Sequence, residues 1–403
     1  LGEAGCHPNS LLRNVGGRQF RDVTFELGLG EEHFPSCTAA WSDFDLDGDV
    51  DLFVGNELAP CQLFRNDGNA GFTDIAQVAG VTNRRFTKGA TWGDFDEDGR
   101  PDLYVSNLEG FNRLYHNNGD GTFTDVAPEL NVRRPFDSFP TWFWDLNNDG
   151  HLDLYVASYE IGVDNVAAEY AGLPPTSQPD CLYLNDGDGG FLEVSSEYGL
   201  TRTTLPMGCN FGDLDNDGFL DFYLGTGVPD LDSIMPNLMF HNLGGERFED
   251  VSVPGGFAHL QKGHGTAFAD LDNDGDQDVF MQMGGAFPVD EYGNVLYENP
   301  GFGNHWIRIK LVGNDSNRCG IGARIRVDII DGEQRREIHR RVNSGGSFGG
   351  NPLQPQIGLG QAEKIASLEV YWPASDTTQV FSDLPVDRLL EIHEGQSDCR
   401  ISE

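Results

Sequence analysis

Short apolar segments and polar turns follow one another along this chain in an order that recurs five times. Each unit opens with an apolar segment and an acidic loop, and two further apolar segments follow, the second ending in Asn. A Phe-containing segment after a glycine turn closes every unit except the fifth. Short apolar runs bounded by Gly and Asn predict β-strands. The pattern therefore predicts units of four antiparallel strands, which are the blades of a β-propeller.

The spacing of the units agrees with this interpretation. The first Asp of successive acidic loops lies 51, 51, 68 and 57 residues after the one before, and such periods are typical of propeller blades. Residues 11–14 and 20–23 match the third and fourth strands of a unit, while no fourth strand follows Asn299. Closed propellers often build one blade from both ends of the chain, which leaves no unpaired sheet edge.

Residues 304–395 contain no acidic loops and alternate between apolar and polar positions over seven expected strands. Two strands before the first unit, nineteen in the units and these seven make twenty-eight, enough for seven blades of four. We therefore expect an all-β fold with a seven-bladed propeller that the C-terminal strands close; a separate β-sandwich built from the same strands is the alternative. The expected domains are the repeats at 1–303 and the segment at 304–395, followed by a tail at 396–403.

The acidic loops share one nine-residue pattern, with ligand-type side chains at positions 1, 3, 5 and 9 and glycine at position 6. The prospective ligands are Asp43, Asp45, Asp47, Asp51, Asp94, Asp96, Asp98, Asp102, Asp145, Asn147, Asp149, Asp153, Asp213, Asp215, Asp217, Asp221, Asp270, Asp272, Asp274 and Asp278. Side-chain oxygens that converge from one coiled loop favour calcium over magnesium. An EF-hand is excluded, because its closing Glu stands at position 12 between two helices. We expect about five calcium ions per chain; acidic surface turns are the alternative, since Asp-Gly is a common hairpin signal.

The net charge of −39 includes the nineteen Asp residues of these loops, so five divalent ions would reduce it to about −29 (−39 plus 10). A chain this acidic is a poor partner for nucleic acid, which is bound through clustered Lys and Arg. No apolar run reaches the roughly 18 residues of a membrane span. Weak calcium loops are typical of extracellular modules, so we expect a monomer that is secreted or periplasmic.

Seven cysteines are too few for a disulfide scaffold in a chain of this length. Cys37 and Cys61 start two strands of one unit at the same end, and Cys181 and Cys209 have a similar placement across two units. An extracellular location permits disulfides, so we expect the bridges Cys37–Cys61 and Cys181–Cys209. The remaining cysteines stay unassigned: Cys6, Cys319 and Cys399.

The face opposite the calcium loops is where we expect function. It carries the longest connections, at 159–180, 227–236 and 284–294, and long loops commonly carry function. The inner strands should begin on this face, at the residues six positions before each loop: Cys37, Lys88, Phe139, Met207 and His264. One interpretation is a pocket at the mouth of the central channel, with Lys88 and His264 as catalytic candidates. The alternative is that these side chains only fill the channel.

A glycine-rich segment and a basic cluster give weaker indications of function. The glycine-rich segment 344–350 lacks the Lys-Ser/Thr pair of a phosphate loop and is expected to be a flexible loop. A basic cluster on one strand pair is expected to be a solvated face, with an anion site as the alternative: Arg335, Arg336, Arg340 and Arg341. No Gly-x-Ser-x-Gly or His-Glu-x-x-His motif occurs, so a serine hydrolase or zinc protease has no support.

The five units resemble the FG-GAP or VCBS-type repeats of integrin alpha-subunit propellers. The C-terminal segment resembles the ASPIC/UnbV domain through five short motifs: Asn304-His-Trp306-Ile, Lys310-Leu-Val-Gly313, Gly320-Ile-Gly-Ala-Arg324, Ile357-Gly-Leu-Gly360 and Val370-Tyr-Trp-Pro373. Together these modules are similar to the cartilage acidic protein family, which occurs in animals and bacteria. The resemblance implies a secreted calcium-binding protein.

Two functions are consistent with these observations. The first is an extracellular binding module that engages a protein or a glycan through the face opposite the calcium loops. The second is a calcium-dependent enzyme for a small-molecule or polysaccharide substrate, a polysaccharide lyase or a natural-product cyclase, with its pocket at the channel mouth. The absence of a recognisable catalytic motif favours the first; the resemblance to UnbV proteins, which are linked to bacterial biosynthetic clusters, favours the second.

Overall fold

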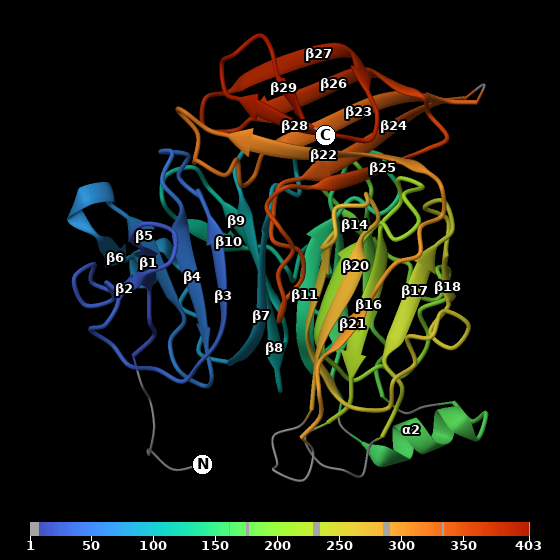
Figure 1. The fold of residues 1–403 in the computed structure, drawn as a ribbon. Coiled ribbons are helices and arrows are strands. Elements are labelled where there is room, and N and C mark those ends of the chain that lie inside the picture. The colour runs from blue at the N-terminus through green and yellow to red at the C-terminus, as the bar shows by residue number, and fades with distance from the viewer. Residues whose placement is uncertain are drawn as a thin grey trace.

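The computed structural model describes residues 8–160, 162–174, 177–228, 234–284, 291–332 and 334–402, and these residues form a β-propeller unit beneath a second all-β unit (Figure 1). Strands β1 (Leu12–Asn14) and β2 (Phe20–Asp22) form a small sheet that precedes the repeats. All nineteen strands expected in the five units are present. Cys6 and parts of the long connections lie outside the described residues.

The first four units are four-stranded antiparallel sheets, and the fifth has three strands. Their strands are β3 (Ser36–Ser42), β4 (Asp51–Asn56), β5 (Gln62–Asn66) and β6 (Phe72–Asp74); β7 (Phe86–Gly93), β8 (Asp102–Leu108), β9 (Arg113–Asn117) and β10 (Phe123–Asp125); β11 (Ser138–Trp144), β12 (Asp153–Ser158), β13 (Cys181–Asn185) and β14 (Phe191–Glu193); β15 (Pro206–Gly212), β16 (Asp221–Thr226), β17 (Leu238–Asn242) and β18 (Phe248–Asp250); and β19 (Gly263–Ala269), β20 (Asp278–Met283) and β21 (Val295–Tyr297). The described helices are short: η1 (Gly68–Ala70), α1 (Ala76–Ala79) and α2 (Val163–Tyr170).

The first strand of each unit lies on the inside of the propeller, where β3 packs against β7, β7 against β11, β11 against β15 and β15 against β19. Sheets stack face to face, so strands such as β4, β12 and β16 are buried along their whole length. Between the third and fourth sheets this packing is aromatic, with Trp142, Trp144, Phe211 and Phe222 in one cluster. Stacked sheets therefore explain why these strands read as continuous apolar runs.

The C-terminal segment forms two sheets of its own, in the strand orders β25-β22-β28-β29 and β24-β23-β26-β27. The strands are β22 (His305–Val312), β23 (Arg324–Asp331), β24 (Gln334–Arg341), β25 (Gln356–Gly360), β26 (Lys364–Trp372), β27 (Thr377–Pro385), β28 (Arg388–His393) and β29 (Arg400–Ser402). Their inner faces meet in a separate core that includes Ile307, Ile325, Leu368 and Trp372. This unit is a β-sandwich.

The expectation that these strands close a seven-bladed ring is therefore wrong, and the sandwich alternative describes the segment. The physical reason lies in the burial pattern. Strand β22 alternates between buried and partly exposed residues, whereas the second strands of the first four units are buried on both faces. A strand with one apolar face needs a single partner sheet, which the sandwich supplies.

Candidate metal centres and the surfaces around them

The five acidic loops have the same backbone conformation. Position 4 lies in the left-handed region in every copy, with φ of 60° at Leu46, 60° at Glu97, 58° at Asn148, 55° at Asn216 and 64° at Asn273. The glycine at position 6 also has positive φ, from 89° at Gly99 to 101° at Gly275, which a side chain would disfavour. The predicted turn at this glycine is confirmed, and position 4 adds a second reversal that coils the loop.

Backbone amides hold the carboxylates of each loop inward. In the first copy the Gly48 N–H donates to Asp43 Oδ2 at 3.2 Å, and the Phe44 N–H donates to Asp51 Oδ2 at 3.1 Å. The same two bonds recur in the other four copies, with lengths of 2.8–3.3 Å. Positions 1 and 9 are therefore oriented toward the loop centre before any ion binds.

Three of the position-1 carboxylates keep a buried oxygen that no described group satisfies: Oδ1 of Asp43, Asp94 and Asp270. Burial, reinforced by Asp47 and Asp45, raises the pKa of Asp43 to about 7, and burial raises the pKa of Asp51 to about 8. Buried carboxylates without partners are costly unless a cation neutralises them. The residues present therefore fit a divalent ion with oxygen ligands. In each of four loops (the first, second, fourth and fifth), carboxylates of that loop lie close enough to one another to hold an ion, with His116 or His241 as a further neighbour in the second and fourth.

The five loops are not equivalent. The residue before the Asn that ends each third strand is Arg65, His116, Leu184, His241 or Glu298. His116 Nδ1 lies 3.3 Å from Asp96 Oδ2 and from Asp102 Oδ1, and His241 Nε2 lies 3.1 Å from Asp215 Oδ2. The neighbouring Asp102 carboxylate raises the pKa of His116, and hydrogen bonding to Asp215 raises the pKa of His241 to about 9. The sequence reasoning missed these imidazoles, because they stand on the third strand and outside the nine-residue pattern.

The recurring Asn was also missed as a functional residue, although its recurrence was visible in the sequence. Its side chain joins each loop to the loop of the preceding unit: Asn117 Nδ2 donates to Phe44 O at 2.8 Å, Asn185 Nδ2 to Phe95 O at 2.7 Å, Asn242 Nδ2 to Leu146 O at 2.9 Å and Asn299 Nδ2 to Leu214 O at 2.7 Å. These bonds link neighbouring loops in series around the propeller.

The sandwich lies over the acidic loops (Figure 1). Arg340, which is 6% exposed, donates to Gly218 O at 2.9 Å and to Asn148 Oδ1 at 3.1 Å, and it lies 3.8 Å from Asp213 Oδ2. Arg308 is ion-paired with the buried Asp270. The basic cluster predicted to be a solvated face is therefore divided: Arg335 is exposed, while Arg340 is buried between the two units.

The glycine-rich segment runs from the sandwich into the centre of the propeller, so the expectation of a flexible loop is wrong. We call residues 343–351 the strap. Ser347 O accepts the Cys209 N–H at 3.4 Å, and Phe348 O accepts the Thr266 N–H at 3.1 Å. The Phe348 ring lies 5.0 Å from the ring of Phe139. Glycines let the backbone approach the inner strands closely enough for these bonds.

Gly349→Ala is expected to lower the free energy of unfolding by about 1–3 kcal/mol, because overpacking forces the backbone apart. A Cβ at this position would lie 1.8 Å from Thr266 O, and φ is +149°. Gly350→Ala is the matched control, since its nearest neighbour to a Cβ is Ser344 O at 3.9 Å. Chemical denaturation of both variants checks the difference; equal stability would show that the strap is not packed as described.

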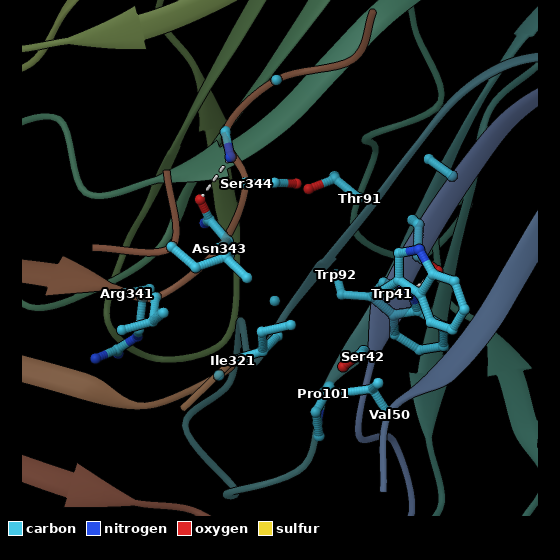
Figure 2. Close-up of a pocket in the computed structure, with 18 of the residues that line it drawn as sticks. Trp41, Ser42, Val50, Thr91, Trp92, Pro101, Ile321, Arg341, Asn343 and Ser344 are labelled. Carbon is cyan, nitrogen blue, oxygen red and sulfur yellow. Dashed lines mark hydrogen bonds between the residues drawn. The ribbon is translucent and has the colours of Figure 1, made fainter. Parts of the chain in front are cut away.

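A cavity of about 360 Å³ remains between the first two sheets, the strap and the sandwich. Figure 2 shows Trp41 and Trp92 close together on one wall, with Asn343 and Ser344 on the opposite one. The Gly345 N–H donates to Asn343 Oδ1 at 2.9 Å, which fixes the turn of the strap (Figure 2). The residues that line the cavity do not include either catalytic candidate.

The two candidates lie elsewhere on the inner strands. Lys88 Nζ lies 3.9 Å from the ring centre of Phe86 and 4.9 Å from that of Phe139, and burial lowers the pKa of this lysine. His264 is on β19, and no hydrogen bond or ion pair joins it to Lys88 in the part of the chain that the structure describes. Phe139 and Met207 pack in one apolar cluster. Among the described residues, no hydrogen bond or ion pair supports a catalytic site made of Lys88 and His264.

The expected disulfides are not formed. Cys37, Cys61, Cys181 and Cys209 are free thiols, as are Cys319 and Cys399. Cys61 Sγ lies 3.2 Å from Thr87 Oγ1 of the next unit, and burial raises the pKa of Cys181 to about 12. Cys61, Cys181 and Cys209 each belong to a different core between sheets, and Cys37 is only partly buried.

Comparison with known proteins identifies both units. A family model described as FG-GAP-like repeat matches residues 43–105, 94–156 and 164–224. A second model, described as ASPIC and UnbV, matches residues 313–398, which cover most of the sandwich. The propeller is thus similar to FG-GAP-like repeats, and the sandwich to the ASPIC and UnbV family. The matched ASPIC and UnbV segment is the part whose arginines reach the acidic loops.

Curated relatives of the chain include cartilage acidic protein 1 of Homo sapiens, 26% identical over 79% of the chain, and of Mus musculus, 26% identical over 81%. The chain spans about half the length of these relatives, 45% and 48%. Solved structures with a similar arrangement include Saccharomyces cerevisiae Sqt1, at 9% identity and a TM-score of 0.36 over 92% of this chain and 78% of that one. The Dos1 propeller matches at 9% identity with a TM-score of 0.36, over 93% of this chain and 76% of that one. No helix among the described residues is long and apolar enough to span a membrane.

Proposed function

We propose that this chain is a secreted, calcium-loaded propeller that acts as a binding module for an extracellular protein or glycan. Its partner contacts the face opposite the acidic loops. The main support for this assignment is the position of the sandwich, which covers the face with the acidic loops and sends the strap into the channel. The opposite face of the propeller is therefore the one that stays free for a partner. Helix α2 (Val163–Tyr170) lies on this end (Figure 1).

Calcium is supported by the donor set. All side-chain positions of the five loops carry oxygen donors, and three buried oxygens lack a partner. A hard cation with six or seven ligands suits such a site. The name of the curated relatives refers to cartilage, a tissue rich in extracellular matrix, and this agrees with secretion and with a protein or glycan partner.

Substituting Asp96 by Ala is expected to remove one bound calcium ion and to leave the other four, since each loop takes its ligands from one unit. Glu129→Ala is the matched control, because Glu129 is an exposed acid of the same unit outside the loop. Metal analysis after gel filtration counts the ions in each variant. Loss of all ions from the Asp96 variant, or of none, would contradict independent sites.

A position-specific block tests the binding face. The exposed Cys319 lies on the sandwich, and Leu173, 61% exposed, follows α2 on the opposite face. Polyethylene glycol attached through maleimide at Leu173→Cys is expected to abolish binding to immobilised matrix proteins or to a glycan array, in a background where Cys6, Cys37, Cys319 and Cys399 are replaced by Ser. The same label on Cys319, with only Cys6, Cys37 and Cys399 replaced by Ser, is expected to leave binding intact; the reverse result would place the binding face on the sandwich.

The alternative of a calcium-dependent lyase or cyclase has less support. It needs an open pocket in which Lys88 and His264 act together, and the Lys88 ammonium instead lies against two phenylalanine rings. Substrate turnover by the wild-type protein that disappears in both Lys88→Ala and His264→Ala would favour the enzyme.

A further inference from the structure

Four arginines gather at the edge of the second sheet on the face away from the acidic loops, and we call them the arginine patch. Arg84 and Arg85 precede β7, Arg113 is the first residue of β9, and Arg133 belongs to the connection after β10. Arg84, Arg85 and Arg113 line an open hollow of about 480 Å³ together with Tyr115 and Asp125. The patch therefore presents several guanidinium groups to one shallow surface depression.

The patch contrasts with the composition of the chain. With 65 acidic residues for 26 lysines and arginines, a basic side chain has more than two carboxylates available to it on average. In the hollow, Asp125 is the one lining carboxylate, and it is already ion-paired with Arg113. The side chains of Arg84, Arg85 and Arg133 make no hydrogen bond or ion pair with any residue in the described ranges. Three guanidinium groups thus lack an anionic partner within a strongly acidic protein.

Within the patch, the guanidinium groups repel one another and lack hydrogen-bond acceptors from the protein. Burial, and then repulsion by Arg113 and Arg133, lowers the pKa of Arg85. Arg133 Nε is buried without an acceptor, and so is Thr82 Oγ1 at the rim of the hollow. The Arg133 guanidinium stacks 3.9 Å above the centre of the Phe111 ring, which holds it in place. Buried donors without acceptors are costly, and a bound oxyanion would satisfy them.

We propose that the arginine patch binds the sulfate or carboxylate groups of an acidic polysaccharide. This assignment rests on the proposed role as a binding module and names the class of its partner. The planar guanidinium fork matches such oxyanions through paired charged hydrogen bonds. The hollow is open, which suits a chain that passes across it, and Phe136 beside the patch is 37% exposed and packs edge-on against Phe111 at 5.3 Å. An aromatic surface next to cations suits a sugar chain with alternating apolar faces and anionic groups.

Calorimetric titration of the calcium-loaded full chain with a size-defined heparin oligosaccharide tests the proposal. Wild-type protein is expected to bind saturably, and Arg85→Gln/Arg133→Gln is expected to bind about 100-fold more weakly, since one charged hydrogen bond is worth roughly a factor of ten or more. Arg18→Gln/Arg247→Gln is the matched control, because both residues are exposed and the same two charges are removed. Its affinity is expected to stay within about threefold of the wild-type value, since exposed charges away from a site contribute little.

Other results would overturn the assignment. Equal affinities of the two double variants would mean that only net charge matters, and the absence of saturable binding would remove the site. Tighter binding of a poly-glutamate peptide would assign the patch to an acidic protein segment, and equal binding of inorganic sulfate alone would reduce it to a small-ion site.

The variant Arg85→Lys/Arg133→Lys keeps both charges but loses the planar guanidinium fork, so an intermediate affinity of this variant supports the proposal even if the Gln variant is unstable. A protein that binds five calcium ions but not the oligosaccharide disproves the patch alone; one that binds the oligosaccharide but holds two or fewer calcium ions disproves the calcium role alone.

Discussion

Removal of calcium is expected to lower the melting temperature of the chain by at least about 10 °C. An ion that binds only the folded state at one hundred times its dissociation constant contributes about 2.7 kcal/mol. At an unfolding entropy of about 2.1 cal/mol/K per residue, each kcal/mol shifts the melting temperature of a 403-residue chain by about 1.2 °C. Four such sites would therefore account for the shift, and the chain has five loops. The physical cause is repulsion among clustered carboxylates, such as the buried Asp43 with Asp47 and Asp45.

Differential scanning calorimetry with and without a chelator measures this effect, and metal analysis gives the number of ions. Magnesium at the same concentration serves as the control, because its strict octahedral geometry suits these loops less well. An unchanged melting temperature, or two or fewer ions per chain, would show that the loops are acidic turns and not calcium sites.

Arg340→Ala is expected to lower the free energy of unfolding by about 3–5 kcal/mol, the usual cost of removing one partner from a buried charge pair. The substitution leaves Asp213, which is fully buried, without the guanidinium that lies 3.8 Å away. It also removes the donors to Gly218 O and Asn148 Oδ1. The loss combines a buried carboxylate without its cation and two unsatisfied acceptors at the contact between the units.

Arg335→Ala is the matched control for this prediction. Arg335 lies on the same strand, and its side chain is 70% exposed, although its partner Asp328 is buried. Arg326 Nε also lies 4.0 Å from Asp328 Oδ1 and remains in the variant, so we expect a loss of about 1 kcal/mol or less. Guanidinium titrations of both variants without calcium compare the two, because an ion in the fourth loop would otherwise neutralise Asp213. Should Arg340→Ala not fold, Arg340→Lys keeps the charge and is expected to lose less; a loss below about 1 kcal/mol in Arg340→Ala would contradict the role of this arginine.

The propeller repeats and their acidic loops could be predicted from the sequence because the signals are local. Positions 1, 3, 5, 6 and 9 of a loop are fixed by one turn of backbone, and the period of the units is visible along the chain. The use of the C-terminal strands could not be derived from a strand count, because twenty-eight strands fit seven blades as well as they fit a propeller with a sandwich. The alternation in strands such as β22 was the better evidence, since it indicates burial on one face only.

Contacts between segments that are distant along the chain could not be predicted from the sequence either. Nothing near Arg340 in the sequence distinguishes it from Arg335, yet the first is buried against Asp213 and the second is exposed. The strap reads as a flexible segment because seven residues with four glycines carry no local structural signal, and its bonds come from the inner strands of the propeller. Equally, Cys37 and Cys61 share one end of a unit, but strand position alone does not determine where their sulfurs point.

The cover that the sandwich places on the loops has a kinetic consequence. An ion beneath a packed domain leaves only as fast as that domain lifts, so the dwell time of each ion depends on the cover and not on its ligands alone. The fourth loop has no exposed residue, whereas Asp45 and Asp47 of the first loop are exposed. Ions with similar affinity would therefore exchange on different timescales, with the first loop emptying quickly and the fourth retaining its ion long after the surrounding solution has been depleted.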